Sequence, residues 1–133
     1  MLRYILDTDT CIYVLRERDP KLLERFNRHA DQVSISAITL AELRYGAENS
    51  QRIAANLAIL DSFVARLAVL DFGPAAASHF ARIRVALKSA PVGPMDMLIA
   101  AHARSADLSV VTGNTREFSR VPDLRIEDWR PQP

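Results

Sequence analysis

The sequence has little cysteine, little lysine and no long apolar run, and each absence narrows what the protein is. Cys11 is the only cysteine among 133 residues, which excludes an internal disulfide and a zinc site built from several thiolates. No apolar stretch approaches the length of about 20 residues that crosses a bilayer. These features predict one globular domain spanning residues 1–133, and they make a cytoplasmic protein without a membrane segment the expectation.

Basic charge is carried almost entirely by arginine. Of 17 basic residues only Lys21 and Lys88 are lysines, and the formal net charge is +1. Arginine binds phosphate bidentately, whereas lysine acts as a point charge. Genomic base composition is the simpler explanation of a general arginine surplus, and a solvated surface explains any single arginine. The candidate phosphate contacts are Arg44, Arg84, Arg104 and Arg116.

Strand and helix patterns alternate along the chain. The predicted strands cover residues 3–7, 33–36, 68–70, 108–112 and 124–126. The first predicted helix is capped by Asp9 or Thr10 and ends near residue 16. The other predicted helices cover about 20–29, 38–48, 53–67, 76–87 and 95–105. Residues 131–133 are expected to form a frayed tail. This order predicts a three-layer α/β/α domain with a central, mainly parallel sheet of four to five strands.

The clearest helical pattern lies between residues 53 and 67. Apolar residues recur there at steps of four, three, four and three, which predicts one buried helical face. The face consists of Ile53, Leu57, Leu60, Val64 and Leu67.

Oxygen-bearing side chains lie at or soon after the ends of the predicted strands and at the start of a late helix. In open α/β sheets, sites lie beyond the carboxyl ends of the strands, so we expect these side chains to converge on one edge. They are Asp7, Asp9, Glu42, Asp96 and Asn114.

Each of these residues also has a simpler explanation. Asp9 best fits a helix cap, Asp96 fits a cap as well, and Glu42 fits a solvated helix position. Asp7 fits such an explanation least, because it ends an apolar strand with a charge that needs a partner. Together on a common edge, the group favours a functional site.

Several carboxylates at one edge need a compensating cation. Two like charges about 4 Å apart repel by roughly 4 kcal/mol at an effective dielectric constant of about 20. Such groups raise one another's pKa or bind a cation, and no lysine lies close to them in the sequence. Oxygen-only ligation favours Mg²⁺, with Mn²⁺ as a substitute, and such a metal polarises a phosphoryl oxygen and activates water.

Four stretches, in order, resemble the motifs of PIN-domain nucleases of the VapC toxin type. Residues 6–10 (LDTDT) resemble the first motif, and residues 36–43 (SAITLAEL) with 45–47 (YGA) resemble the second. Residues 93–103 (GPMDMLIAAHA) and 111–118 (VTGNTREF) resemble the third and fourth, and Asp128-Trp129 fits the end of such toxins. The resemblance covers essentially the whole chain.

The resemblance implies a Mg²⁺-dependent endoribonuclease that is the toxin of a type II toxin–antitoxin system. The family's carboxylates correspond to Asp7, Glu42 and Asp96. Asp7 and Asp96 are expected to ligate the metal, and Glu42 to ligate it or to position the attacking water. The residues expected to orient these groups are Thr8, Thr112 and Asn114.

The resemblance also implies partners. The expected substrate is RNA, with tRNA or another structured RNA favoured. A cognate VapB-like antitoxin is expected to inhibit the toxin by laying its C-terminal segment across the active-site groove. A homodimer within a larger toxin–antitoxin assembly is expected, with operator DNA bound indirectly through the antitoxin.

The sequence departs from the family pattern at two positions. Asp9 stands where the family usually has Asn, so it either tightens metal binding or caps the helix. Asn114 stands where many PIN domains have a fourth Asp, and its amide oxygen ligates a metal or orients water without adding charge. Asn114 is therefore a weaker candidate than the three carboxylates.

Three other functions fit parts of the sequence. A haloacid-dehalogenase-like phosphatase would use Asp7 as nucleophile and Asp9 as general acid, but it needs a downstream lysine in a matching motif, and Lys88 has none. A receiver-type phosphoacceptor would use Asp71, but it needs a late lysine that is missing. A non-catalytic PIN-like binding module has no evident reason to keep three carboxylates.

Three further residues that can carry chemistry are interpreted as structural. His102 lies six residues after Asp96 and therefore well round the helix from it. Cys11 lies in an apolar helical stretch and is predicted to be core. Trp129 is predicted to pack against the domain rather than to stack on a base.

Overall fold

The computed structural model describes residues 1–17 and 19–130, so the prediction of a frayed tail at 131–133 lies outside the described residues. The elements, in chain order, are β1 (Tyr4–Leu6), α1 (Thr8–Leu15), α2 (Pro20–Arg28), the 3₁₀ turn η1 (Ala30–Gln32), β2 (Val33–Ser36), α3 (Ala37–Glu48), α4 (Ile53–Val64), β3 (Ala68–Leu70), α5 (Pro74–Ala86), α6 (Pro94–Ser105), β4 (Ser109–Val111), α7 (Thr115–Phe118) and β5 (Ile126–Glu127).

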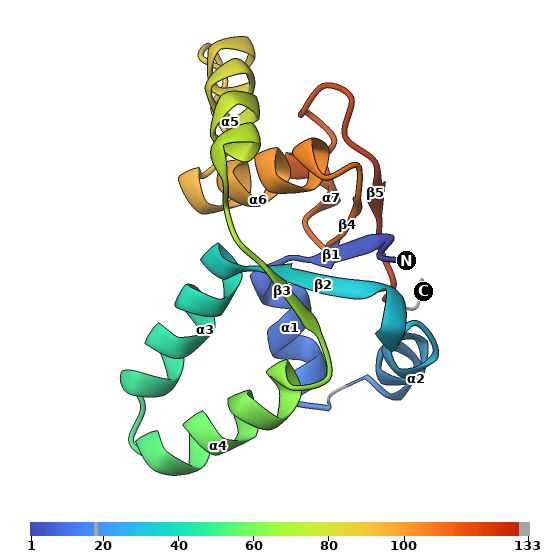
Figure 1. Cartoon of the computed structure of the whole chain (residues 1–133), viewed down its shortest axis with the longest axis vertical. Coiled ribbons are helices and arrows are strands. Elements are labelled where there is room, and N and C mark those ends of the chain that lie inside the picture. Colours follow the sequence, from blue (N-terminus) through green and yellow to red (C-terminus); the bar gives the residue numbers. More distant parts are fainter. Residues whose placement is uncertain (18, 131–133) are drawn as a thin grey trace.

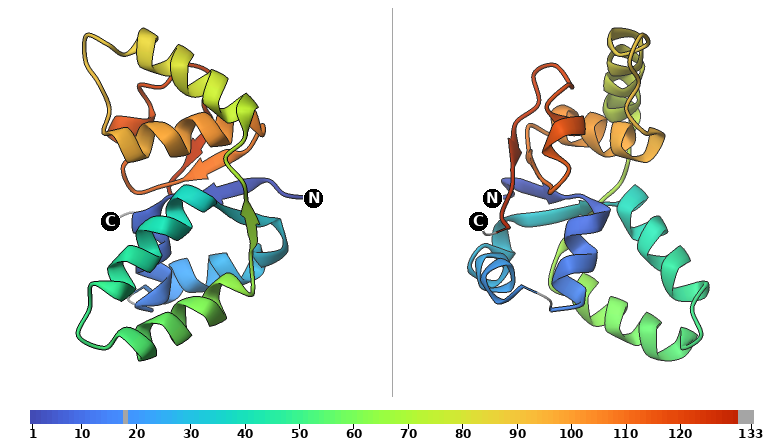
Figure 2. Two further views of the ribbon diagram at one scale, coloured as in Figure 1. Left: turned by 60° about the vertical axis from the view of Figure 1, so that its left-hand side comes forward. Right: turned by 180° about the vertical axis from the view of Figure 1, so that it is seen from behind.

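The five strands form one sheet in the order β3-β2-β1-β4-β5, and every neighbouring pair is parallel. Helices α1 to α4 lie on one side of the sheet and α5 to α7 on the other, which confirms the predicted three-layer α/β/α fold (Figures 1 and 2). The chain runs outward from β1 through β2 to β3 and then returns to β4 on the opposite side of β1. The strand order therefore reverses between β1 and β4, and ligands bind beyond the carboxyl ends of strands at such a point.

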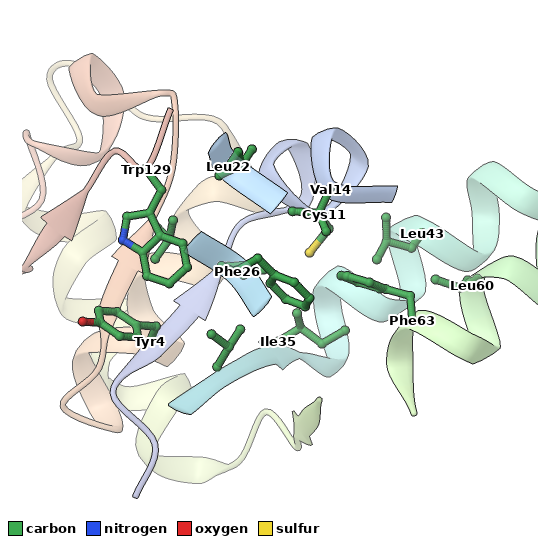
Figure 3. Close-up of a cluster of buried hydrophobic side chains, with 13 residues drawn as sticks. Tyr4, Cys11, Val14, Leu22, Phe26, Ile35, Leu43, Leu60, Phe63 and Trp129 are labelled. Carbon is green, nitrogen blue, oxygen red and sulfur yellow. The ribbon is translucent and has the colours of Figure 1, made fainter. Parts of the chain in front are cut away.

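The sheet divides the interior into two cores because successive side chains of a strand point to opposite faces. Tyr4 and Leu6 of β1 belong to the core beneath α1 to α4, whose members Figure 3 shows, whereas Ile5 belongs to the core beneath α5 to α7. In β4, Val111 belongs to the core beneath α1 to α4 and Val110 to the core beneath α5 to α7. None of the helices in the described part of the chain is long and apolar enough to cross a membrane.

Helix α1 begins earlier than the sequence predicts. Its cap is Asp7, whose carboxylate accepts a hydrogen bond from the Thr10 backbone N–H, so the predicted cap at Asp9 or Thr10 is wrong. The second predicted helix start is confirmed, because Asp19 caps α2 and Pro20 is its first residue. A cap must precede the first helical turn, and Asp7 is the residue at which the extended strand backbone ends.

Helix α4 is present, and its predicted buried face is confirmed in part, because Leu60 is buried and Val64 and Leu67 pack against the core. Ile53 is 44% exposed, and Leu67 lies beyond the end of the helix. The fully buried residues of α4 are Leu60 and Phe63, and the Phe63 ring stacks on Phe26 at a centroid distance of 5.6 Å. The first turn of α4 lies far from the sheet, so apolar periodicity there does not translate into burial (Figure 1).

Two short elements were not predicted, and one strand is displaced. The 3₁₀ turn at 30–32 and helix α7 at 115–118 are too short to show a hydrophobic period. The last strand covers Ile126–Glu127 rather than 124–126, because its pairing with Val110 and Val111 of β4 sets its position.

His102 of α6 connects two helices through the interior. Its imidazole is buried, and Nδ1 lies 2.8 Å from the hydroxyl of Ser36, which caps α3. Burial lowers the pKa of His102 below its ordinary value of 6.5, against the hydrogen bond and charge of Asp71, which raise it. The histidine is therefore a structural link, as the sequence suggests.

We expect Phe26→Ala to lower the free energy of unfolding by about 3–5 kcal/mol, because it leaves a cavity in a fully buried core position. Urea unfolding of the purified protein measures this change. Ile59→Ala, on a residue that is 55% exposed, is the control and should change stability by no more than about 0.5 kcal/mol. Equal effects of the two substitutions would contradict the assignment of the core.

We expect His102 to make stability fall as the pH drops below 6.5. Below pH 6.5 the His102 imidazole of the unfolded chain binds a proton, whereas in the folded protein it stays neutral until the pH reaches its lowered pKa. Within that window the free energy of unfolding changes by up to about 1.4 kcal/mol per pH unit for this group. Denaturation at several pH values should show that the free energy of unfolding depends less on pH in His102→Gln than in the parent. His79→Gln measures the separate contribution of the other histidine whose pKa is lowered. Parallel profiles for parent and His102→Gln would reject this role.

Candidate active site at the carboxyl ends of β1 and β4

Asp7 lies at the end of β1, where the strand order of the sheet reverses. Its side chain is only 2% exposed. One carboxylate oxygen accepts a hydrogen bond from the Thr10 backbone N–H at 2.9 Å, and the other accepts one from the Thr112 hydroxyl at 2.5 Å. The backbone N–H of Asp7 donates to Val111 of β4 at 3.1 Å. Asp7 is thus held by its own helix and by the neighbouring strand.

A chain of hydrogen bonds leads from Asp7 to Asp96. The Thr112 hydroxyl donates to Asp7 and accepts from the backbone N–H of Asn114 at 2.8 Å. The Asn114 side-chain amide then donates to Asp96 Oδ2 at 3.0 Å. Asp96 lies in the first turn of α6, which Pro94 begins. We refer to Asp7, Thr112, Asn114 and Asp96 as the hydrogen-bonded chain.

Glu42 approaches the same edge from α3. The hydroxyl of Thr8, next to Asp7, donates to Glu42 Oε1 at 2.6 Å and lies 3.5 Å from the hydroxyl of Thr39. Thr39 and Glu42 are three residues apart and share one face of α3. Hydrogen bonds thus link Asp7 to Asp96 through Thr112 and Asn114, and Glu42 contacts Thr8 beside Asp7. Their catalytic roles remain predictions.

The pKa values show that these carboxylates act on one another. Burial raises the pKa of Asp7 above its ordinary value, and the charge of Asp9 adds to the rise, against hydrogen bonds from Thr10 and Thr112. Burial also raises the pKa of Asp96, and the charges of Asp7, Asp9 and Glu42 raise it further, against the hydrogen bond from Asn114. The site thus concentrates negative charge that a cation would relieve.

The donor set fits a hard divalent cation in its chemistry. Carboxylate and amide oxygens are the ligands that Mg²⁺ and Mn²⁺ prefer. Among residues 1–17 and 19–130, no three acidic, histidine or cysteine side chains are close enough to form a ligand cluster as they stand. Asp7, Glu42 and Asp96 are instead bonded to Thr112, Thr8 and Asn114. Each of these carboxylates keeps acceptor positions beyond those bonds, so the bonds are compatible with a role in orienting metal ligands.

The candidate phosphate contacts lie in different surroundings. Arg44 pairs with Asp61 at 3.2 Å, Arg104 donates to His79 Nδ1 at 2.8 Å, and Arg84 lines a hollow with Phe80 and Met97. Arg116, in α7 two residues after Asn114, is exposed. Of the four, Arg116 is therefore the nearest to the hydrogen-bonded chain in sequence.

The structure disfavours the two phosphate-chemistry alternatives. Lys88, the lysine that a dehalogenase-like phosphatase would need, lines the hollow between α5 and α6 rather than the surroundings of Asp7. Asp71, the candidate phosphoacceptor, is exposed after β3, which is an edge strand separated from β1 by β2.

Cys11 and Trp129 are buried, as predicted. Trp129 packs edge-on against Tyr4 at a centroid distance of 4.9 Å and lies under the guanidinium of Arg25. This packing anchors the end of the described chain beside β1.

Sequence reasoning missed the contact between Arg130 and the loop that carries Asn114. Arg130 donates to the Gly113 carbonyl at 3.1 Å, and Asp128 holds the guanidinium through two bonds of 3.0 and 2.9 Å. A Cβ at position 113 would lie 2.7 Å from Cζ of Arg130, so a larger residue there would displace the guanidinium. The sequence carries no local signal of this contact, because its two partners are 17 residues apart.

Comparison with known proteins finds matches over nearly the whole chain. The PIN-domain family model matches residues 4–124. The chain is 50% identical over 131 residues to the tRNA(fMet)-specific endonuclease VapC of Shigella flexneri, covering 97% of this chain and 99% of that protein. It is 46% identical to ribonuclease VapC2 of Haemophilus influenzae strain Rd, over 97% of this chain and 99% of that protein.

Solved structures give the same result. The DNA-bound VapBC complex of Salmonella typhimurium contains a chain that matches with a TM-score of 0.93 at 50% identity, covering 97% of this chain and 99% of that one. VapBC-1 of nontypeable Haemophilus influenzae matches with a TM-score of 0.87 at 32% identity, covering 96% and 98%. The full-length match in sequence and fold shows that the chain belongs to the PIN-domain family and, within it, to the VapC ribonucleases.

Proposed function

We propose that the protein is a Mg²⁺-dependent endoribonuclease that hydrolyses phosphodiester bonds of tRNA and is the toxin of a toxin–antitoxin pair. PIN-domain nucleases generally depend on a divalent metal ion. The observation that supports the activity best is the hydrogen-bonded chain from Asp7 to Asp96, with Glu42 joined to the residue next to Asp7. Mn²⁺ is expected to replace Mg²⁺, because both take oxygen ligands.

Three carboxylates divide the work in this proposal. Asp7 and Asp96 hold the metal, and Glu42 holds it or accepts a hydrogen bond from the attacking water. A bound divalent ion supplies charge that polarises the phosphoryl oxygen and lowers the pKa of water. Burial excludes bulk water around Asp7, so its charge acts at low screening.

The neighbouring hydroxyl and amide groups orient these carboxylates. Thr112 fixes the Asp7 carboxylate through one oxygen while the Thr10 N–H occupies the other. Asn114 orients Asp96, and Thr8 orients Glu42. Such supporting bonds keep charged groups aligned before substrate arrives.

The substrate proposal follows from the relatives. VapC of Shigella flexneri and VapC of Salmonella typhimurium, each 50% identical to this chain, are both tRNA(fMet)-specific endonucleases. We infer that initiator tRNA is the substrate of this protein as well. The formal net charge of +1 supplies little general attraction to nucleic acid, so recognition must come from local contacts.

A groove beside the active site suits the antitoxin. It lies between α1, α3 and α4, has a volume of about 370 Å³ and includes Glu42. A segment seated there therefore reaches the carboxylates. The related solved structures are VapBC complexes, some of them bound to DNA, which supports a VapB-like partner that carries the DNA-binding function. We call this surface the apolar groove; it is lined by Ile12, Leu15, Arg16, Glu42, Leu43, Gly46, Ala47, Asn56, Ile59 and Leu60.

We expect Asp7→Asn and Asp96→Asn to lower RNA cleavage by more than about 100-fold, since loss of orienting partners alone costs about 10–100-fold at metal sites. Thermal melting should show that stabilisation by millimolar Mg²⁺ is reduced as well. Without divalent ions the melting temperature of Asp96→Asn should equal or exceed that of the parent, because one of several repelling charges is gone.

Asp31→Asn is the matched control, since Asp31 is an exposed carboxylate in the 3₁₀ turn at 30–32. It should keep both cleavage and Mg²⁺ stabilisation. A folded Asp96→Asn protein that cleaves initiator tRNA at the parental rate would refute the proposed site.

We expect Ile59→Asp to weaken inhibition by the antitoxin by at least about tenfold, because an unpaired carboxylate is costly to bury in an apolar contact. Titration of tRNA cleavage with the purified antitoxin measures this change, while cleavage without antitoxin should stay at the parental rate. Ile53→Asp, on the same helix but outside the apolar groove, is the control and should be inhibited normally. Normal inhibition of Ile59→Asp would place the antitoxin elsewhere.

A further inference from the structure

A second hollow, on the other side of α1 from the apolar groove, begins at the carboxylate edge. It has a volume of about 480 Å³, within the range of about 300–1,000 Å³ that small-ligand sites occupy. Ile12 and Arg16 line both hollows, so the two meet along α1. We call the second hollow the Tyr13 pocket; it is lined by Asp9, Thr10, Ile12, Tyr13, Arg16, Leu22, Gly113, Asn114 and Arg130.

Helix α1 spaces three functional groups along one wall of the Tyr13 pocket. Asp9, Tyr13 and Arg16 are separated by four and three residues and therefore lie above one another on one helical face. From Asp9 to Arg16 the helix rises about 10 Å. The wall thus presents a carboxylate beside the hydrogen-bonded chain, then an aromatic ring, and then a guanidinium.

The Tyr13 ring and Arg16 are both exposed to solvent. Tyr13 is 41% exposed although it lines a hollow. Arg16 is exposed, and no ion pair among residues 1–17 and 19–130 includes it. An exposed aromatic ring next to a cation is a combination that binds a base and its phosphate.

The opposite wall is held in place. Asp128 holds the Arg130 guanidinium through two hydrogen bonds, and Arg130 donates to Gly113. The hydrogen bond to Asp128 raises the pKa of Arg130, and a hydrogen bond with Tyr13 adds to the rise, so the phenol of Tyr13 contacts the guanidinium. Because Asp128 neutralises Arg130, this wall shapes the pocket, whereas Arg16 supplies a positive charge at the end of the pocket away from Asp9.

We propose that the Tyr13 pocket is a subsite for one nucleotide of the RNA next to the phosphodiester that is cut. The ring of Tyr13 stacks on the base, and the guanidinium of Arg16 binds the phosphate on the side away from the carboxylates. This inference rests on the proposed ribonuclease function. It adds that specificity at one position flanking the cut comes from stacking in this pocket.

The residues that line the two hollows suit different ligands. The apolar groove is lined mainly by aliphatic side chains, which suit a protein segment. The Tyr13 pocket combines an aromatic ring, a phosphate-binding cation and polar groups of the active-site loop, which suit a nucleotide. Arg16 belongs to both, so an antitoxin in the groove is positioned to compete for the phosphate contact.

The test uses a short RNA containing the cut phosphodiester, in which each flanking nucleotide in turn is made abasic. With the parent protein and Mg²⁺, removing the base at one of these positions should lower kcat/KM by about 5- to 150-fold, the range for stacking of one base on an aromatic ring. Tyr13→Ala should show the reduced rate with intact RNA and no further loss with the abasic RNA. Tyr13→Phe should retain the parental sensitivity to base removal.

Tyr45→Ala is the matched control, because Tyr45 is a tyrosine of α3 that is 69% exposed and lines neither hollow. It should behave as the parent does. For Arg16→Ala, the slope of log KM against log salt should become shallower by about 0.7, the value for one phosphate contact on a single strand. Arg52→Ala, outside both hollows, should leave the slope unchanged.

The outcomes distinguish the subsite from the ribonuclease itself. If the parent cuts RNA but loses the same factor on base removal as Tyr13→Ala does, the subsite is refuted and the ribonuclease function stands. If the parent shows no sensitivity to base removal at either flanking position, the subsite is likewise refuted. If the parent cuts neither initiator tRNA nor the short RNA with Mg²⁺ or Mn²⁺, the proposed function fails and the subsite fails with it.

Discussion

The buried carboxylate of Asp7 is the interaction on which the rest of the structure depends. Asp7 follows β1, caps α1, donates its backbone N–H to Val111 of β4 and accepts a hydrogen bond from Thr112 just after β4. It therefore joins a strand, a helix and a neighbouring strand. The strand order reverses at this point, which leaves an opening between the crossovers on either side. Everything that reaches the opening, including Asp96 through Asn114 and Glu42 through Thr8, is positioned relative to Asp7.

The site carries an electrostatic cost that the fold compensates only in part. Hydrogen bonds from hydroxyl, amide and backbone donors favour the charged carboxylates, but burial and neighbouring charges still raise the pKa values of Asp7 and Asp96. A structure selected for stability alone would place neutral or apolar side chains here. The buried carboxylates at the point where the strand order reverses are therefore best explained by function. The chain belongs to a family of ribonucleases, so that function is RNA cleavage.

Helix α1 separates the apolar groove, which we propose binds the antitoxin, from the Tyr13 pocket, which we propose binds a nucleotide. On one side it borders the apolar groove with α3 and α4, and on the other it borders the Tyr13 pocket with the active-site loop. Both surfaces begin at acidic residues of the site, Glu42 in one case and Asp9 in the other. In this proposal, α1, which Asp7 caps, places the nucleotide and antitoxin surfaces on either side of the same carboxylates.

Local sequence determined the longer helices and most of the strands, because hydrophobic period and proline position are properties of neighbouring residues, whereas helix α7 and the position of β5 did not follow from it. It also pointed to Asp7, Glu42 and Asp96, since strand ends and motif order are visible in the chain. Tertiary structure decided what depends on distant partners. Phe63 rather than Ile53 is buried in α4, His102 supports the cap of α3, and Arg130 packs on Gly113, because each depends on a surface contributed by another part of the chain.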